Sequence, residues 1–455
     1  MFLFAIDMIP ESNTISYSYP APSAFIAGGE SRLLLAGYSE LEKSSGPAFF
    51  EGSLEQPYIT ARCLIALSNV VRSSFTLSPA QAGLMKDPIV TAGAEKLRFE
   101  GFSQCAGVYA RVDVLPGGHR GTFPANGTVN VDFNQPMINA LHAVGRSDTM
   151  QLTVNATAIS VQSQPEERIT EKKVPLPVKW IKGLTTVQLF LAASEKVHTL
   201  NKVQLRQLFQ GIPAGTVKAD YYLAVRGNRP AFSPVKTANA VCVGGIHRLR
   251  LLEPLLPLAE ALQVFVHPDM QSTTWQLYFG NVRFSLSLSR EAWRGFSGEG
   301  AALEALVADV PERLISAMDK YGHVNQEFNA TLLAVEEQAG FEQIDQLTAR
   351  LAAMGLLGFD LDDNVYFYRR LPFKLNRIMS LNPRMKDAEQ LLAEDKVGIV
   401  SQKENKTEAR VAGSGVTHTV VIEDDLARCT CTWFAKHQGE RGPCKHILAV
   451  RKKIN

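Results

Sequence analysis

Four residues near the C-terminus have the types and the spacing of a metal site. They are Cys429, Cys431, Cys444 and His446, in the pattern C-x-C-x12-C-x-H. Three thiolates and one imidazole complete the tetrahedral shell of a structural Zn²⁺ site, so no position remains for a substrate or an activated water. The sequence therefore predicts one structural zinc ion. His437 is an alternative fourth ligand, but its position between the two ligand pairs fits this pattern less well than that of His446.

The first half of the surrounding module is expected to be a β-hairpin. Apolar and polar residues alternate over 416–421, which predicts a strand, and the acidic residues 423–425 predict the turn after it. A second strand is then expected to carry Cys429 and Cys431. Their thiols would point to one face of that strand because the two residues are two positions apart.

A helix is expected to supply the other two ligands, which completes a ββα finger. Pro443 suits the first turn of a helix, and Cys444 and His446 would lie in that turn, where free backbone N–H groups favour thiolate over thiol. A module with so small a core is expected to unfold without its metal. The expected core residues are Trp433, Ile447, Leu448 and Val450.

Basic residues surround the predicted ligands, with seven Lys or Arg and one Glu from Arg428 to the end of the chain. A basic zinc module suits phosphate groups, so contact with nucleic acid or with a partner protein is one interpretation. The candidate contact residues are Lys436, Arg441, Lys445, Arg451, Lys452 and Lys453. The alternative is a solvated helix end, where cations complement the helix dipole, and few aromatic residues are present to stack on bases.

The single-residue gap within both ligand pairs resembles the SWIM zinc-finger family, which is defined by C-x-C…C-x-H. Residues 443–450 are also similar to the second half-site of that family. The segments that resemble long bacterial SWIM proteins are 97–102, 174–180, 293–298 and 371–373. The resemblance implies a module that binds DNA or protein. For the long bacterial members it implies an association with MoxR-type AAA+ ATPases and von Willebrand A domain proteins, and it implies no catalytic residue.

The composition limits the class of protein. A chain of 455 residues is too long for one core, and 45% hydrophobic with 20% charged residues is ordinary for a folded protein. A net charge of +2 gives no global polyanion-binding signature. Six cysteines, three of them in the metal motif, suit a reducing compartment. The start is a poor signal peptide and no apolar run approaches the ~18 residues that span a bilayer, so we expect a cytoplasmic protein without membrane contact.

Periodicity along the chain predicts an α+β, multi-domain protein whose N-terminal body is rich in antiparallel sheet. Alternating segments predict strands with one buried and one solvated face; they are 97–99, 108–114, 129–133 and 152–158. Expected helices are 58–75, 135–144, 185–193, 202–209, 253–262, 341–354 and 387–394, and a hairpin is expected over 275–288. Expected domains are 1–161, 178–325, a helical or winged-helix-like unit at 326–383, and the finger at 409–455, after a polar linker at 401–408.

The winged-helix-like unit does not have the charge of a nucleic-acid reader. Its would-be recognition helix carries Glu342 and Asp345, with only Arg350 for positive charge. This is the wrong sign for contact with phosphates and base edges in the major groove. Packing or contact with a protein is therefore the preferred role for this unit.

No catalytic motif is found in the sequence. Cys105 could act as a nucleophile only with a histidine partner that the sequence does not identify, and burial in the core is the simpler interpretation, as it is for Cys63 and Cys242. Three hypotheses follow. The first is a non-enzymatic, zinc-binding adaptor whose finger contacts protein or nucleic acid. The second is a DNA- or RNA-binding protein, and the third is an unrecognised enzyme in the N-terminal body.

Overall fold

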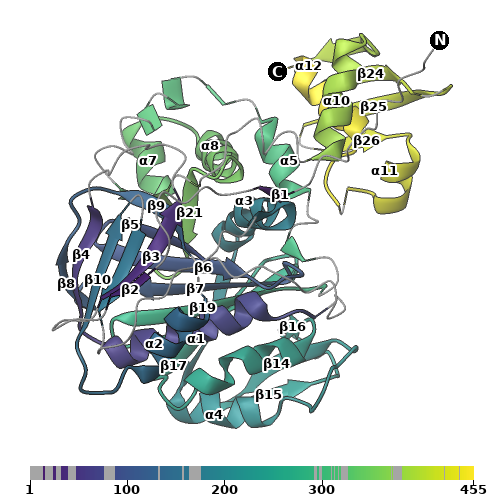
Figure 1. The fold of residues 1–455 in the computed structure, drawn as a ribbon. Helices are drawn as coiled ribbons and strands as arrows, with labels where there is room; N and C mark the ends of the chain where they lie inside the picture. Colours follow the sequence, from purple (N-terminus) through teal and green to yellow (C-terminus); the bar gives the residue numbers. More distant parts are fainter. Residues whose placement is uncertain are drawn as a thin grey trace, which may run out of the picture.

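The fold is α+β, as the sequence predicts (Figure 1). The computed structural model describes residues 14–15, 24–26, 32–38, 48–75, 88–131, 134–155, 158–162, 176–291, 295–296, 300–308, 310–311, 313–315, 317–318, 326–369, 371, 382–413, 415–424, 426–439 and 441–454. Among these residues no helix is both long enough and apolar enough to cross a bilayer.

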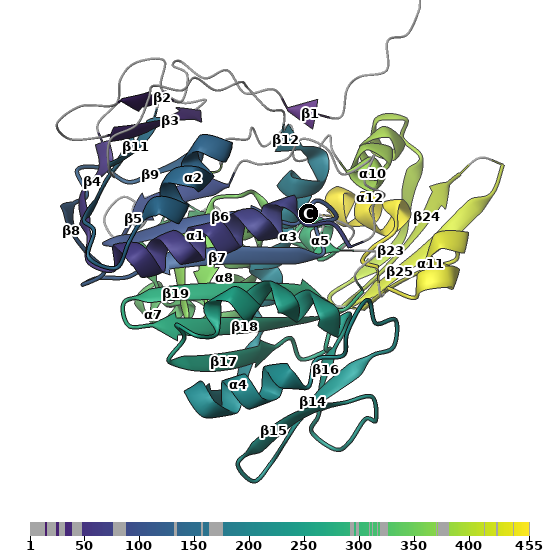
Figure 2. The same cartoon turned by 60° about the horizontal axis from the view of Figure 1, so that its bottom comes forward.

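One large antiparallel sheet runs through the body (Figures 1 and 2). Its strand order is β13-β17-β18-β19-β7-β6-β5-β9-β3-β11-β10-β4-β8, and β2 pairs with β3. The bounds are β2 Ala24–Ile26, β3 Arg32–Tyr38, β4 Ala48–Leu54, β5 Ile89–Gly93, β6 Lys96–Phe102, β7 Val108–Val114, β8 His119–Thr122, β9 Gly127–Val131, β10 Met150–Asn155, β11 Ala158–Gln162, β13 Glu195–Asn201, β17 Ala261–Val266, β18 Ser272–Phe279 and β19 Val282–Ser289. Pairing of β19 with β7 joins two regions that are far apart in sequence. The predicted domain bounds stay predictions.

The central strands are buried on both faces, so the prediction of one solvated face is wrong there. Every residue of β5, β6, β7 and β19 is buried. Helix α1, Pro57–Arg72, packs along β6, β7 and β19 (Figure 2). The other face carries charged side chains such as Arg98 and Asp113, which are 1% and 0% exposed. Alternation reports which way a side chain points, but not whether another element covers it.

The winged-helix-like unit covers this polar face. It contains β20 Glu327–Phe328, α7 Ala330–Glu336, α8 Phe341–Ala353, β21 Leu357–Asp360 and β22 Val365–Tyr368, with strand order β20-β22-β21. Arg111 Nη1 of β7 donates to the Phe359 carbonyl oxygen at 2.7 Å. The N–H of Phe359 donates to Gln188 Oε1 of α3, Val178–Ala192, at 2.8 Å. The wing, residues 357–369 with strands β21 and β22, therefore packs against both the central sheet and helix α3.

The helices predicted over 135–144 and 202–209 are confirmed. The remaining helices of the body are α2 Gln135–Ala143, α4 Lys202–Gln210 and α5 Ala301–Leu306, and Asn134 caps α2 by accepting a hydrogen bond from the N–H of Met137. The remaining strands are β1 Thr14–Ile15, β12 Leu176–Pro177, β14 Tyr221–Arg226, β15 Arg229–Ser233 and β16 Val241–Val243. The predicted hairpin is confirmed as β18 and β19, with Gly280 at φ +65° in its turn.

The helix predicted over 253–262 is wrong. A 3₁₀ helix, Ile246–Leu255, ends within this range, and β17 begins at Ala261. Proline has no N–H and its ring clashes with the preceding turn, so Pro254 and Pro257 oppose an α-helix here. Residues 253–255 belong instead to the 3₁₀ helix, and 261–262 belong to β17, which pairs with β18.

Candidate metal centre

The C-terminal module is larger than the predicted ββα finger (Figure 1). Its four-stranded antiparallel sheet has the order β23-β24-β25-β26, formed by Val397–Lys403, Lys406–Ala412, Thr417–Glu423 and Leu426–Cys429. The polar linker predicted at 401–408 is wrong, because these residues belong to the β23–β24 hairpin. One face of that hairpin is solvated, which gave it the polar composition of a linker. Helix α10, Pro383–Ala393, packs on α12, Lys445–Ile454.

The four predicted ligands converge in this module. Their ligand atoms all lie within 4.8 Å of one another, and all four residues are buried. His446 Nδ1 lies 3.7 Å from Cys429 Sγ and 4.0 Å from Cys444 Sγ. Zn–S bonds of about 2.3 Å and a Zn–N bond of about 2.0 Å place neighbouring tetrahedral ligands about 3.6 Å apart. The arrangement fits one structural Zn²⁺ held by three sulfurs and by Nδ1 of the histidine.

Both ligand pairs lie at the start of a helix, the first directly after a strand and the second after a loop. Cys429 ends β26, but Cys431 is the N-cap of α11, Thr432–His437, and not a strand residue as predicted. Its Sγ accepts a hydrogen bond from the N–H of Phe434 at 3.4 Å. Cys444 directly precedes α12, and its Sγ accepts from the N–H of Ile447 at 3.5 Å. These N–H groups favour the thiolate form that zinc requires.

Contacts among the thiols already favour one thiolate. The hydrogen bond from Cys429 is the main reason that the pKa of Cys444 is lowered to about 4, and the same contact raises the pKa of Cys429. Burial is the main cause that raises the pKa of Cys431. Zinc binding must displace the remaining protons, so the affinity of the site for metal rises with pH.

His437 does not join the cluster. Its ring lies on α11 against the indole of Trp433, with the two centroids 4.4 Å apart. The other histidine near the site is His418 of β25, whose ring lies 4.4 Å from that of His446. The set of ligands is therefore the one that the C-x-C…C-x-H spacing indicates.

Arg384 of α10 supports the loop that carries Cys444, a role that no motif in the sequence indicates. Its Nη1 donates to the carbonyl oxygens of Arg441 and Pro443 at 2.8 and 2.7 Å. The guanidinium also lies over the ring of Trp433, 4.8 Å from its centroid. Loss of a residue that orients metal ligands typically weakens metal binding by about 10–100-fold.

Most of the predicted contact cations are paired within the molecule. Four ion pairs join α12 and its start to neighbouring acids: Lys445–Asp387 at 3.2 Å, Arg451–Glu304 at 2.5 Å, Lys452–Glu389 at 2.8 Å and Lys453–Asp395 at 3.3 Å. Lys436 is exposed on α11, and Arg441 is half-buried. The basic end of the chain therefore docks the finger on α10 and α5 as well as offering charge to solvent.

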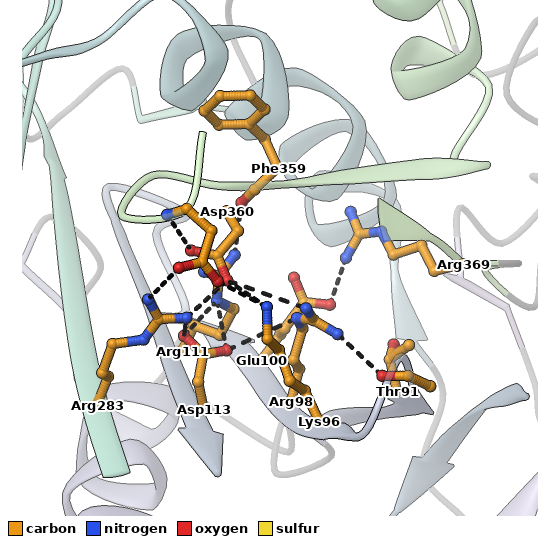
Figure 3. Close-up of polar contacts among 12 residues, drawn as sticks. Thr91, Lys96, Arg98, Glu100, Arg111, Asp113, Arg283, Phe359, Asp360 and Arg369 are labelled. Atoms are coloured by element: carbon orange, nitrogen blue, oxygen red, sulfur yellow. Dashed lines mark hydrogen bonds and ion pairs between the residues drawn. The ribbon is translucent and has the colours of Figure 1, made fainter. Parts of the chain in front are cut away.

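A second cluster of charges, absent from the sequence predictions, lies beneath the wing (Figure 3). We refer to it as the buried ion network; its residues are Lys96, Arg98, Glu100, Arg111, Asp113, Arg283, Glu327, Asp360, Asp362, Asp363 and Arg369. Lys96 Nζ lies 2.9 Å from Glu327 and 2.6 Å from Asp363. Arg369 of the wing pairs with Glu100 of the sheet. These mutual pairs indicate a role in docking the wing.

The described C-terminal residues thus define a structural zinc-finger module attached to an α+β body. Residues 418–452 match the family model of the SWIM zinc finger, so this module is a SWIM zinc finger. No curated protein matches the chain. Among solved structures, "Proliferating Cellular Nuclear Antigen from Entamoeba histolytica" is similar with a TM-score of 0.36 and 7% identity, over 53% of this chain and 99% of that chain.

Proposed function

We propose that the protein is a cytoplasmic, non-enzymatic adaptor that uses its zinc-stabilised finger and the adjoining body to hold a partner protein. The observation that carries this proposal is the closed shell of four protein ligands around the metal position. A zinc ion with four protein ligands stabilises a fold and activates no water. The three metal-binding thiols suit the reducing conditions of the cytoplasm.

The partner classes implied by the SWIM resemblance are a MoxR-type AAA+ ATPase and a von Willebrand A domain protein. Docking of the finger supports a fixed binding surface, because Arg451 of α12 pairs with Glu304 of α5 and Arg384 bonds to the loop before Cys444. A finger held against its body presents both parts to one partner.

A nucleic-acid-binding protein is the second candidate. Arg410 and Arg428 are exposed on the outer face of the finger sheet, and Lys436 is exposed on α11. These cations could contact phosphates. Against this, four of the six predicted contact cations are already in ion pairs.

The test is a pull-down of the tagged full chain from its native host, with and without nuclease. The matched variant is Cys429→Ser/Cys431→Ser, which removes two zinc ligands. Protein partners that survive nuclease and require the cysteines support the adaptor function. Recovery of nucleic acid that depends on intact cysteines, with affinity that falls steeply as salt rises, supports the second candidate and contradicts the first.

A further inference from the structure

A cleft of 880 Å³ lies between the helical part of the body and the zinc finger; we refer to it as the finger–body cleft. Helices α3, α5 and α8 and strand β22 form one side, and β25, the turn after it and α12 form the other. Its size is within the range of pockets that hold a ligand or a few side chains, about 300–1,000 Å³, and is too small for a folded domain.

Apolar side chains from both sides line the finger–body cleft. Leu189 of α3 and Ala349 of α8 lie on the body side, and Ile422 and Ile454 lie on the finger side. Leu189, Ala349 and Ile454 are only partly buried, so they retain apolar surface that an occupant could cover. Burial of such surface stabilises a complex by roughly 25 cal/mol per Å² before the costs of association.

Carboxylates dominate the charge of the same cleft. Among the described residues, Glu304, Glu342, Asp345 and Asp424 line it with a single cation, Arg451, whose guanidinium is 2.5 Å from Glu304. Glu342, Asp345 and Asp424 form no ion pair within the described part of the chain. Although Asp345 reaches solvent, partial desolvation raises its pKa, as expected for a carboxylate without a nearby cation.

We propose that the finger–body cleft binds a basic amphipathic segment of a partner protein, in which a Lys or Arg is flanked by apolar side chains. The aliphatic stem of the cation would lie along Ala349 and Leu189, and its charged head would pair with Glu342 and Asp345. Nucleic acid and acidic peptides are disfavoured because like charges would face each other. This inference rests on the proposed adaptor function and adds the chemistry of the partner.

The finger must be folded and docked for this cleft to exist. Ile422, Asp424 and Ile454 all belong to the zinc module. The module touches the body where two glycines meet, and a Cβ placed on Gly442 would lie only 2.6 Å from the Cα of Gly300. Binding of the partner segment in the cleft is therefore coupled to zinc.

The experiment uses the zinc-loaded full chain and a random peptide library displayed on phage. Enriched peptides are then measured by fluorescence anisotropy against the wild type and against Glu342→Lys/Asp345→Lys on α8. The control is Glu336→Lys/Glu404→Lys, which makes the same charge change at exposed positions that do not line the cleft. A third variant, Ala349→Trp, fills the apolar floor without changing charge.

We expect enriched peptides to combine Lys or Arg with apolar residues. Reversal of the two cleft charges should weaken binding about tenfold or more, Ala349→Trp should also weaken it, and the control should bind as the wild type does. Zinc content and melting temperature, measured for every variant, separate loss of the site from loss of the fold.

Three results would overturn the inference: no enriched peptide, enriched peptides without cations, or binding that survives the reversal of the cleft charges. Self-association that the reversal abolishes would also overturn it, since a second copy would then be the occupant.

The pull-down distinguishes failure of this inference from failure of the proposed adaptor function. A partner that requires Cys429 and Cys431 but binds Glu342→Lys/Asp345→Lys normally would leave the adaptor function standing and this inference wrong. Absence of any cysteine-dependent partner would instead count against the adaptor function.

Discussion

Arg283 and Asp360 are 77 residues apart in sequence and form a buried ion pair, with Arg283 Nη2 2.6 Å from Asp360 Oδ2. Their side chains are 1% and 0% exposed. Arg283 belongs to β19 of the central sheet and Asp360 ends β21 of the wing (Figure 3). The wing that a DNA-binding protein would present to a groove is therefore packed on the body through its own acidic residues.

Asp360→Asn should strongly destabilise the protein. The carboxylate lies within 3.9 Å of guanidinium nitrogens of Arg98 and Arg111 as well as contacting Arg283. Removal of one partner from a buried pair leaves uncompensated charge, and the expected loss is about 3–5 kcal/mol of the free energy of unfolding. Denaturant unfolding measures it. Asp363→Asn is the control, because Asp363 is 42% exposed, and its loss should stay under about 1 kcal/mol. Equal losses of unfolding free energy in the two variants would show that burial of the ion pair does not determine its contribution to stability.

Asp360 should also make the free energy of unfolding depend on pH. Burial alone would raise the pKa of Asp360, but the guanidinium groups of Arg283, Arg111 and Arg98 outweigh it and hold the pKa well below its usual range. Because the folded pKa is below the unfolded one, this stabilisation is complete at neutral pH and is lost as the pH falls below about 4. The free energy of unfolding measured between about pH 6 and pH 3 should fall less steeply for Asp360→Asn than for the wild type. An equally steep fall in the two proteins would contradict a lowered pKa for Asp360 in the folded state.

Local spacing predicted the metal site because its ligands are set by short distances along the chain. The C-x-C and C-x-H pairs put Cys429, Cys431, Cys444 and His446 within reach of one ion, and the stripe over 341–354 predicted α8. The same local rules could not show that Arg98 and Asp113 would be buried. The segment that covers them lies more than 200 residues later. The role of Arg384 could not be predicted for the same reason, because the Arg441 carbonyl oxygen that it contacts is 57 residues later in the sequence.

Loss of zinc should unfold the finger and leave the body folded. Cys444→Ser removes a ligand, and treatment of the wild type with a chelator removes the metal, from a module in which all four ligands are buried together. Zinc content should fall from one per chain to near zero, and amide exchange should rise over β25 and α12 but not over β6 and β7. Cys242→Ser is the matched control, because Cys242 is buried in β16 outside the cluster and its change should leave zinc content unaltered.

Arg384→Ala should weaken zinc binding without removing a ligand. The guanidinium holds the carbonyl oxygens of Arg441 and Pro443, and loss of such support typically costs about 10–100-fold in metal affinity. Arg384→Lys should restore little, since an ammonium cannot reproduce the planar guanidinium fork. Competition with a chromophoric chelator measures the affinity. Arg410→Ala, on the exposed face of β24, should bind zinc as the wild type does, and a loss there equal to that of Arg384→Ala would argue against a specific support role.

Gly300→Val should separate the finger from the body while the finger keeps its zinc. A Cβ at position 300 would lie 2.3 Å from the Arg441 carbonyl oxygen and 2.7 Å from the Gly442 Cα, so a side chain cannot fit while the two parts remain docked. We expect unchanged zinc content, faster amide exchange in α5 and α12, and weaker binding of any peptide that occupies the finger–body cleft. Gly398→Val is the control, because the nearest atom to a Cβ there is the Arg410 carbonyl oxygen at 3.8 Å and the position lies in a strand, where valine is favourable. Loss of zinc in Gly300→Val would show instead that the metal site itself depends on docking to the body.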